Sequence, residues 1–113
     1  MAIPELQKKR VEAALAAFCE RVPAHLRPKL AHGFRIRGNA VELYERRPRF
    51  DDATRFIELA FARFKYVPGD RGWGLQWRDR NGRWHLYEGF ERGRRFGNLV
   101  KQVERDPTGI FFG

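Results

Sequence analysis

The chain has 113 residues, of which 42% are hydrophobic and 14% aromatic, which is enough for the core of one ordinary domain. No apolar run approaches the roughly 20 residues of a membrane span, and residues 1–10 lack the apolar stretch of a signal peptide. The single cysteine, Cys19, has no partner for an internal disulfide, so we expect a cytoplasmic protein without membrane association. The formal net charge of +9 favours a polyanionic partner.

Residues 4–22 predict an amphipathic helix that begins at Pro4, a residue suited to the first helical turn. Four apolar residues at spacings of four, three and four share one face: Val11, Leu15, Phe18 and Val22. Pro23 ends this helix, and we expect a short second helix or turn to direct Leu26 and Leu30 inward.

Residues 33–45 predict a β-hairpin whose two-residue turn is Gly38-Asn39. Pairing outward from this turn gives an apolar face made of Phe34, Ile36, Val41 and Leu43. The same pairing gives a polar face made of Arg35, Arg37, Glu42 and Tyr44.

A charged loop at 46–55 leads into a long strand at 55–67. The second half of this strand alternates cleanly: Phe64 and Tyr66 on one face, Arg63 and Lys65 on the other. In the first half, three apolar residues share the parity of the basic ones: Ile57, Leu59 and Phe61. Either a β-bulge resets the faces, or an apolar patch lies on the polar face under a helix, the C-terminal tail or a second subunit.

Residues 73–88 hold all three tryptophans and predict a second hairpin, with Asn81-Gly82 as a type I′ turn. This turn pairs Arg80 with Arg83 and, further out, Asp79 with Trp84, Arg78 with His85, Trp77 with Leu86 and Gln76 with Tyr87. The predicted core face is then Trp73, Leu75, Trp77, Trp84 and Leu86. The predicted polar face is Gln76, Arg78, Arg80, Arg83, His85 and Tyr87.

A basic loop at 89–95 precedes a predicted helix with one apolar stripe, and this helix ends at Asp106-Pro107. The stripe consists of Phe96, Leu99, Val100 and Val103. The tail is too apolar to be free, so we expect three residues to dock on the body: Ile110, Phe111 and Phe112. The predicted fold is a single α+β domain at 1–113: an N-terminal helix, a five-stranded, mostly antiparallel meander sheet, and a C-terminal helix packed on one sheet face.

The run WGLQWRDRNGRWHLYE, followed by a short helix and the ending ERDPTGIFFG, resembles the bacterial domain-of-unknown-function family numbered 3024. The segments ELYERRP and FARFKYV are also similar to the central part of that family. The resemblance covers the chain from about residue 5 onward and implies a small single-domain protein. It implies no activity. Phe56 is one departure, because a tryptophan or another bulky residue is expected there.

The basic sheet face predicts a surface for nucleic acid or another polyanion, because phosphate contacts release counterions and tyrosines stack on unpaired bases. The candidate binding residues are Arg35, Arg37, Tyr44, Arg63, Lys65, Arg78, Arg80, Arg83, His85 and Tyr87. Two alternatives stay open for the same residues. One is an ordinary solvated face shielded by long arginines, and the other is a contact with an acidic protein partner.

An enzyme is a further alternative, because a helix followed by a basic antiparallel sheet is similar to the small ribosome-dependent toxins that cleave messenger RNA. In that case the residues that position and protonate the phosphate are His85, Arg78, Arg83 and Tyr87.

A metal-dependent nuclease would need carboxylates, and the chain offers Glu42, Glu45, Asp51, Asp52 and Glu58. The arginines beside them favour salt bridges instead, at Arg46, Arg47, Arg49 and Arg55. One cysteine and three scattered histidines exclude a zinc site, and no nucleotide-binding motif is present, so we expect no metal and no cofactor.

The last alternative is a protein-interaction module, with a homodimer formed through Ile57, Leu59 and Phe61. A core contact of these residues under the C-terminal segment is the competing interpretation, and it is favoured.

Overall fold

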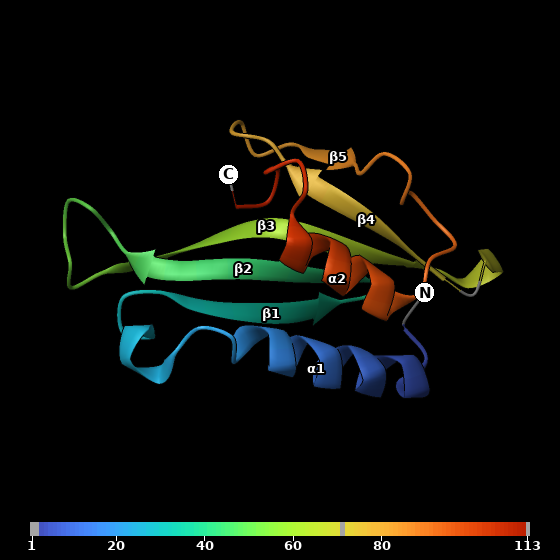
Figure 1. The fold of residues 1–113 in the computed structure, drawn as a ribbon, viewed down its shortest axis with the longest axis horizontal. Helices are drawn as coiled ribbons and strands as arrows, with labels where there is room; N and C mark the ends of the chain where they lie inside the picture. The colour runs from blue at the N-terminus through green and yellow to red at the C-terminus, as the bar shows by residue number, and fades with distance from the viewer. Residues whose placement is uncertain (1–2, 71, 113) are drawn as a thin grey trace.

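A computed structural model describes residues 3–70 and 72–112 of the chain. Helix α1 (Glu5–Cys19) and a short 3-10 turn, η1 (Ala24–Leu26), precede the sheet. The sheet consists of β1 (Ala31–Arg37), β2 (Ala40–Pro48), β3 (Phe56–Val67), β4 (Gly72–Arg78) and β5 (Trp84–Leu86). A 3-10 turn, η2 (Pro68–Asp70), joins β3 to β4, and helix α2 (Phe96–Arg105) follows β5. The strands lie in the order β1-β2-β3-β4-β5 and are all antiparallel to their neighbours, which confirms the predicted α+β meander (Figure 1).

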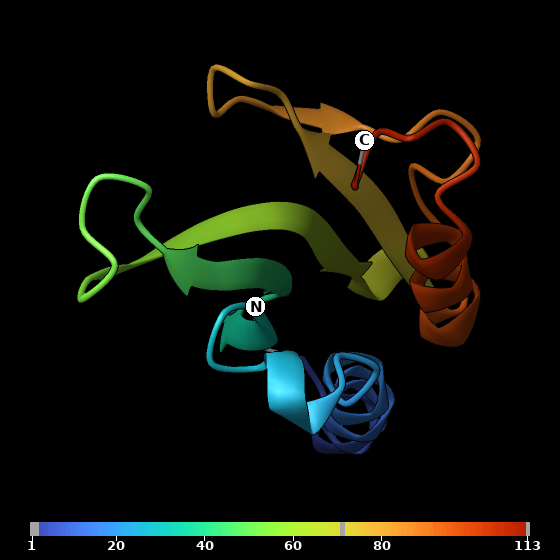
Figure 2. The ribbon, with the colours of Figure 1, turned by 60° about the vertical axis from the view of Figure 1, so that its left-hand side comes forward.

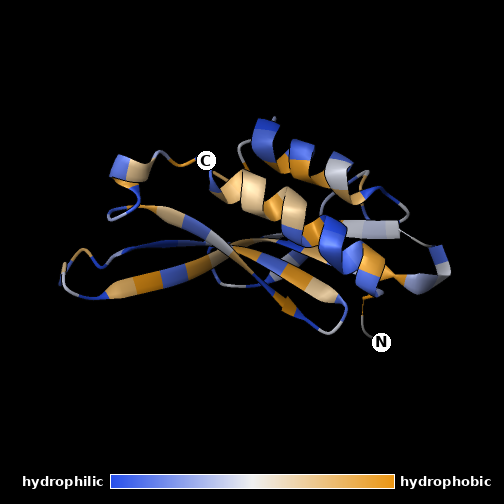
Figure 3. Cartoon of the chain, turned by 90° about the horizontal axis from the view of Figure 1, so that it is seen from below, coloured by the Kyte–Doolittle hydropathy of each residue, from blue (hydrophilic) through white to orange (hydrophobic). Residues whose placement is uncertain are grey.

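Both helices lie on the same side of the sheet and turn their apolar stripes toward it (Figure 3). Helix α1 packs against β1 and α2, whereas α2 packs against β3 and β4. The largest fully buried side chains are Trp73, Phe18, Phe64, Leu15, Leu43, Leu75, Leu99, Val11, Val41 and Val103. The opposite side of the sheet therefore has no helix over it, as the turned view also shows (Figure 2).

The first hairpin has the predicted register, with Ile36 opposite Val41 and Arg35 opposite Glu42. Its turn begins at Gly38, which has a φ of 57°, a conformation that costs glycine little. The alternation predicted for β1 and β2 is therefore correct.

A β-bulge in β3 resolves the parity conflict of the long strand. Leu43 faces Ala62 and Tyr44 faces Ala60, so Phe61 is the extra residue between them. Ile57 and Leu59 consequently share the face that carries the core, and no apolar patch forms among the basic residues. They lie where the β2–β3 hairpin extends past the helices, which leaves Leu59 39% exposed (Figure 1).

The predicted register of the tryptophan hairpin is wrong by one residue. Arg78 faces Trp84 and Gln76 faces Leu86, because the loop has three residues rather than two. The amide of Gly82 donates to the Asp79 carbonyl (3.0 Å), and the amide of Asp79 donates to the Arg83 carbonyl (2.9 Å).

In this loop Gly82 has a φ of 81°, whereas Asn81 does not have positive φ, so the turn is not type I′. Because one extra residue enters the loop, each side chain of β5 lies on the face of the sheet opposite to the predicted one. Trp84 and Leu86 face away from the helices, and His85 and Tyr87 take the core side.

The C-terminal tail is held by the residue that ends α2. Asp106 adopts a φ of 42°, and its carboxylate accepts hydrogen bonds from the amides of Phe111 (3.0 Å) and Phe112 (2.8 Å). Phe111 is buried, as predicted, and Phe112 packs against Phe18 although half of it is exposed. Ile110 stays 37% exposed. The predicted inward position of Leu26 is wrong, because that side chain is 41% exposed in η1.

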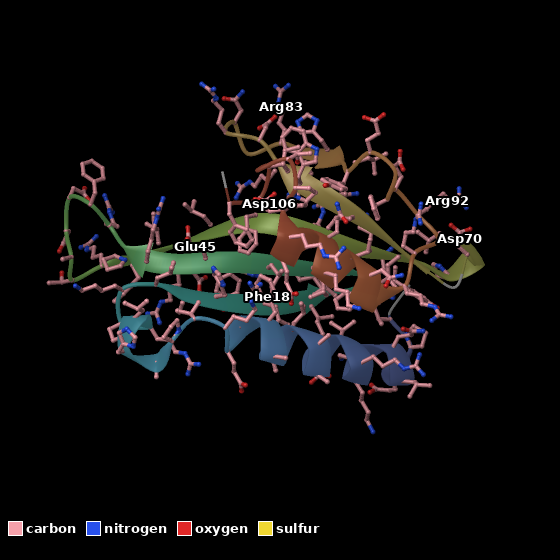
Figure 4. All side chains as sticks on the ribbon, in the orientation of Figure 1. Phe18, Glu45, Asp70, Arg83, Arg92 and Asp106 are labelled. Atoms are coloured by element: carbon pink, nitrogen blue, oxygen red, sulfur yellow. The ribbon has the colours of Figure 1, made fainter. Side chains whose placement is uncertain are left out.

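Two glycines of β4 allow the segment at 91–94 to cross the strand at close range. A Cβ at Gly72 would lie 2.8 Å from the backbone of Gly93, and one at Gly74 would collide with the Glu91 carbonyl oxygen. A bidentate ion pair between Arg92 and Asp70 secures the segment from outside (Figure 4). This crossing sets the place at which α2 begins.

We expect Gly74→Ala to lower the free energy of unfolding by about 3 kcal/mol, because the added methyl group meets rigid backbone. Gly69→Ala is the matched control, since a Cβ there meets no atom within 4 Å. Urea unfolding followed by circular dichroism measures both variants. Equal stabilities would contradict the close crossing of β4.

Candidate functional site

The sheet surface opposite the helices, here called the helix-free face, carries most of the candidate residues. Register and alternation place on it, among others, the side chains of Arg35, Arg37, Glu42, Tyr44, Arg46, Glu58, Arg63, Lys65, Gln76, Arg78, Trp84 and Leu86. Six of these side chains are basic and two are acidic, so the face as a whole is positive.

Two arginines on this face are fixed by the two carboxylates. Glu42 lies 4.0 Å from both Arg35 and Arg63, and Glu58 lies 3.3 Å from Arg35. Arg63 also donates from Nε to the Oε1 of Gln76 at 2.7 Å. Burial lowers the pKa of Arg63 and the charge of Glu42 opposes that shift, so the guanidinium stays protonated at neutral pH.

The same two arginines stack on the aromatic rings of the face. The guanidinium carbon of Arg35 lies 4.7 Å from the ring centre of Tyr44, and that of Arg63 lies 4.5 Å from the ring centre of Trp84. Tyr44 rests on Gly33, where a Cβ would lie 2.5 Å from the ring. A stacked guanidinium still has N–H groups at its edge, and these can donate to a phosphate oxygen.

The other basic residues of the face are less restrained. Within residues 3–70 and 72–112, no carboxylate forms an ion pair with Arg37, Arg46, Lys65 or Arg78. Arg46 stacks on Phe56, with its guanidinium carbon 4.4 Å from the ring centre, but like the other three it has no carboxylate partner and keeps its charge for an anionic ligand.

The structure brings six of the ten predicted binding residues together on the helix-free face: Arg35, Arg37, Tyr44, Arg63, Lys65 and Arg78. Arg80 and Arg83 are exposed in the loop of the β4–β5 hairpin, where Arg83 lies opposite Asp79 and therefore not on the helix-free face.

Two predicted residues lie on the other side of the sheet, His85 and Tyr87. Tyr87 is only 6% exposed, and its hydroxyl accepts a hydrogen bond from Gln102 Nε2 (3.0 Å), so it cannot stack on a base. Sequence reasoning missed Trp84 on the helix-free face. The signal that identifies it is Asp79, because an aspartate at the first position of a type I turn competes with the Asn-Gly preference for type I′.

The β4–β5 loop is built around the carboxylate of Asp79. Its Oδ1 accepts hydrogen bonds from the amides of Asn81 (2.8 Å) and Arg83 (3.0 Å). Its Oδ2 lies 2.7 Å from the Nε2 of His85, whose ring stacks on Trp77 with 4.5 Å between centroids. The hydrogen bond with His85, followed by those from the backbone, lowers the pKa of Asp79 to about 2.

The remaining chemically active groups do not form a second site. Among the described residues, no group of three His, Cys, Asp or Glu side chains is placed to hold a metal ion. Cys19 is half-buried, and burial raises the pKa of its thiol, which makes it a poor nucleophile. His32 packs between Phe18 and Phe61, where burial lowers its pKa. No helix in the described part of the chain is long and apolar enough to cross a membrane.

Comparison with known proteins confirms the resemblance found in the sequence. The family described as Domain of unknown function (DUF3024) matches residues 3–113, the whole length of the fold described above. No curated protein and no solved structure matches the chain.

The depressed pKa of Asp79 predicts a pH-dependent contribution to stability. Because the folded-state pKa of about 2 lies below the ordinary value of 3.8, the ionised carboxylate stabilises the fold above about pH 4, and this contribution is lost as the pH falls toward 2. We expect Asp79→Ala to be less stable than the wild type at pH 6 and to approach it at pH 2. Urea titrations across this range measure the difference, and a difference that does not change with pH would contradict the assignment.

Proposed function

The chain belongs to the DUF3024 family, and we propose that it binds nucleic acid through its helix-free face, with a preference for single strands. The observation that supports this most is the charge balance of the face. Glu42 and Glu58, the carboxylates that the described strands place on this face, already have arginine partners, and four further cations share the face with them. A phosphate chain laid across the centre of this surface meets more cations than carboxylates, and Glu91, which lines a pocket with Lys65, Gln76 and Leu86, lies at the edge of the face.

The aromatic residues favour nucleic acid over other polyanions. Tyr44 and Trp84 flank the centre of the face, and each carries an arginine on its ring. Bases stack on aromatic rings and on guanidinium planes alike, so these two layered pairs offer flat surfaces between the phosphate-binding cations. Sulfated or phosphorylated polymers without bases gain nothing from such surfaces.

The shape of the face favours a single strand over a duplex. The side chains lie across the strands of an open sheet, and neither α1 nor α2 lies on that face as a helix that could enter a major groove (Figure 2). An open sheet with stacked aromatic residues is the arrangement that single-strand binders use.

We expect the triple variant Arg37→Ala, Lys65→Ala, Arg78→Ala to weaken binding of a labelled single-stranded oligonucleotide. Each phosphate contact that is lost reduces the number of counterions released on binding. The slope of log K against log salt concentration should therefore fall in magnitude by about 2. Fluorescence anisotropy between 50 and 200 mM salt, concentrations over which phosphate contacts show clearly, measures this.

The matched control removes the same charge from the exposed surface elsewhere, as Lys9→Ala, Lys29→Ala, Lys101→Ala. If both triple variants bind equally well, net charge alone causes the binding and the helix-free face is not the site. If the wild-type protein binds no oligonucleotide at 50 mM salt, the proposed function is wrong.

A second candidate function, metal-independent cleavage of RNA, is favoured by one contact only. Asp79 orients His85, and Arg83 lies in the same loop, which is the arrangement expected of a general base beside a phosphate-binding group. Asp79 also has a full structural role in the turn, and His85 lies on the side of the sheet opposite the helix-free face. Binding without cleavage is therefore the preferred proposal.

Cleavage by this route should continue in the presence of EDTA and should stop with His85→Ala. His25→Ala is the control, because His25 is an exposed histidine in η1. Incubation of labelled RNA with the wild-type protein and with each variant, followed by gel electrophoresis, decides between binding alone and cleavage. Intact RNA after incubation with the wild-type protein would remove this candidate.

A further inference from the structure

Strand β3 has an open edge at residues 56–60, here called the open segment. The segment is paired with β2, but β4 accompanies β3 only from Ala62 to Val67. Among the described strands, no other lies on that side of the segment. The β2–β3 hairpin extends past both helices at this point, so neither helix covers the segment (Figure 1).

The backbone of the open segment directs hydrogen-bonding groups toward the open edge. The amide of Tyr66 donates to the carbonyl of Asn39 at 2.8 Å, so Asn39 and every second residue of β2 face β3. The register then turns the amides and carbonyls of Ile57 and Leu59 toward β2. Those of Glu58, between them, point to the side from which β4 has already diverged. Such an edge is a template for one more strand.

The sequence here lacks the features that normally protect an edge strand. Residues 56–61 read FIELAF, without proline or lysine and with one charge. That charge, Glu58, is paired with Arg35 at 3.3 Å. The β-bulge at Phe61 lies at the inner end and leaves the open segment in regular register with β2. An apolar run on an open edge calls for a strand partner.

A groove of about 420 Å³ lies beside the edge, where β4 diverges from β3. One wall is formed by residues 59–61 of β3 and the other by residues 78–82 of the β4–β5 loop. Ile110 and Phe111 of the C-terminal tail complete the lining. Leu59 and Ile110 are 39% and 37% exposed, so the groove offers apolar surface to a partner.

The tip of the β2–β3 hairpin matches this groove in chemistry. Phe50 is fully exposed at the tip, and Asp51 and Asp52 lie next to it in the chain. The groove combines its apolar surface with two basic residues, Arg78 and Arg80. Antiparallel pairing of two open segments brings the tip of each copy to the groove of the other, because tip and groove lie at opposite ends of the segment.

The charges of the hairpin end favour a second copy of the chain over another partner. Residues 45–59 contain four carboxylates and four arginines, so this stretch is neutral in a chain of net charge +9. Two copies that meet here avoid the repulsion that the rest of the surface would impose. Three of the carboxylates pair within the stretch: Glu45 with Arg47, Asp51 with Arg49, and Asp52 with Arg55.

We propose that the chain forms a two-fold symmetric dimer in which the open segments of two copies pair antiparallel. Backbone hydrogen bonds join the edges, and Ile57 and Leu59 pack against their counterparts on the helix side of the sheet. Phe50 of each copy enters the groove of the other. Phe61 stays within its own copy, where its ring packs against Phe112 with 5.1 Å between centroids. The contact uses the same surface on both copies, so it closes at two.

Sedimentation of nuclease-treated protein from micromolar to millimolar concentration tests the dimer. We expect the mass to rise with concentration from the 13.4 kDa of the monomer toward twice that value. Added salt should strengthen the association, because it screens the repulsion between two copies of charge +9. A dimer bridged by nucleic acid would instead dissociate as salt is added, and that result would contradict the proposal.

Leu59→Lys should weaken dimerisation about tenfold or more, because it places like charges close together where the two edges meet. Leu26→Lys is the matched control, since Leu26 is 41% exposed but lies in η1, away from the open segment. Thermal unfolding followed by circular dichroism establishes that both variants fold. Equal dimerisation by the two folded variants would sink the proposal.

Cysteine variants locate the two-fold axis. In antiparallel pairing of identical strands, the residue on the axis faces its own counterpart. In a Cys19→Ser background, we expect one of three variants to form a disulfide-linked dimer under mild oxidation: Ile57→Cys, Glu58→Cys or Leu59→Cys. Leu26→Cys measures the yield from random collision, and the yield of that one variant should clearly exceed it.

Two further results would overturn the proposal: a monomer at every concentration, or no cysteine variant above the Leu26→Cys yield. A protein that remains monomeric leaves the open edge to a strand from a different protein. None of these results decides the nucleic-acid proposal, because the substituted residues are not among the cations of the helix-free face. Loss of oligonucleotide binding in the helix-free-face variant would in turn leave the dimer intact.

Discussion

The carboxylate of Asp79 fixes the surface chemistry of the sheet. It accepts hydrogen bonds from two backbone amides and forms a third with His85. These contacts stabilise a β4–β5 loop of three residues. Strand side chains alternate with a period of two, so the length of that loop decides which residues of β5 face the helices. A two-residue loop would expose Tyr87 and bury Trp84. The observed loop does the reverse, and it thereby provides the aromatic ring on which Arg63 stacks.

Strand β4 divides its alternating residues between the helix-free face and the core. One side of the strand carries Gln76 and Arg78 onto the helix-free face, whereas the other buries Trp73 against Phe96 at the start of α2. Glycines at 72 and 74 let the segment at 91–94 cross closely, and the bridge between Trp73 and Arg94 then sets the start of α2. A single strand thus places polar side chains on one side and a buried ring on the other.

The sequence predicted the register correctly where the local pattern allowed no more than two arrangements of the strand. The first hairpin alternates cleanly around Gly38, and both its turn and its register were predicted correctly. The parity conflict at Phe61 had a physical solution, a β-bulge, which was predicted as one of two options and is confirmed. Five of the ten predicted binding residues lie on these strands, and their faces depend on alternation and not on the second turn.

The remaining errors came from side-chain contacts that pattern reasoning does not include. Asn-Gly favours a type I′ turn, but the hydrogen bonds of Asp79 stabilise a type I turn with Gly82 in the left-handed region.

The helix-free face combines fixed and mobile cations, and the two kinds contribute differently to binding. Arg35 and Arg63 are held by carboxylates and aromatic rings in the free protein, so a ligand that meets them loses little side-chain entropy. Arg37, Lys65 and Arg78 lack such partners in the described residues, and their ordering opposes binding while their counterion release favours it. In the proposed nucleic-acid complex, the fixed pair would support specificity for stacked bases, and the cations without partners would make binding depend on salt.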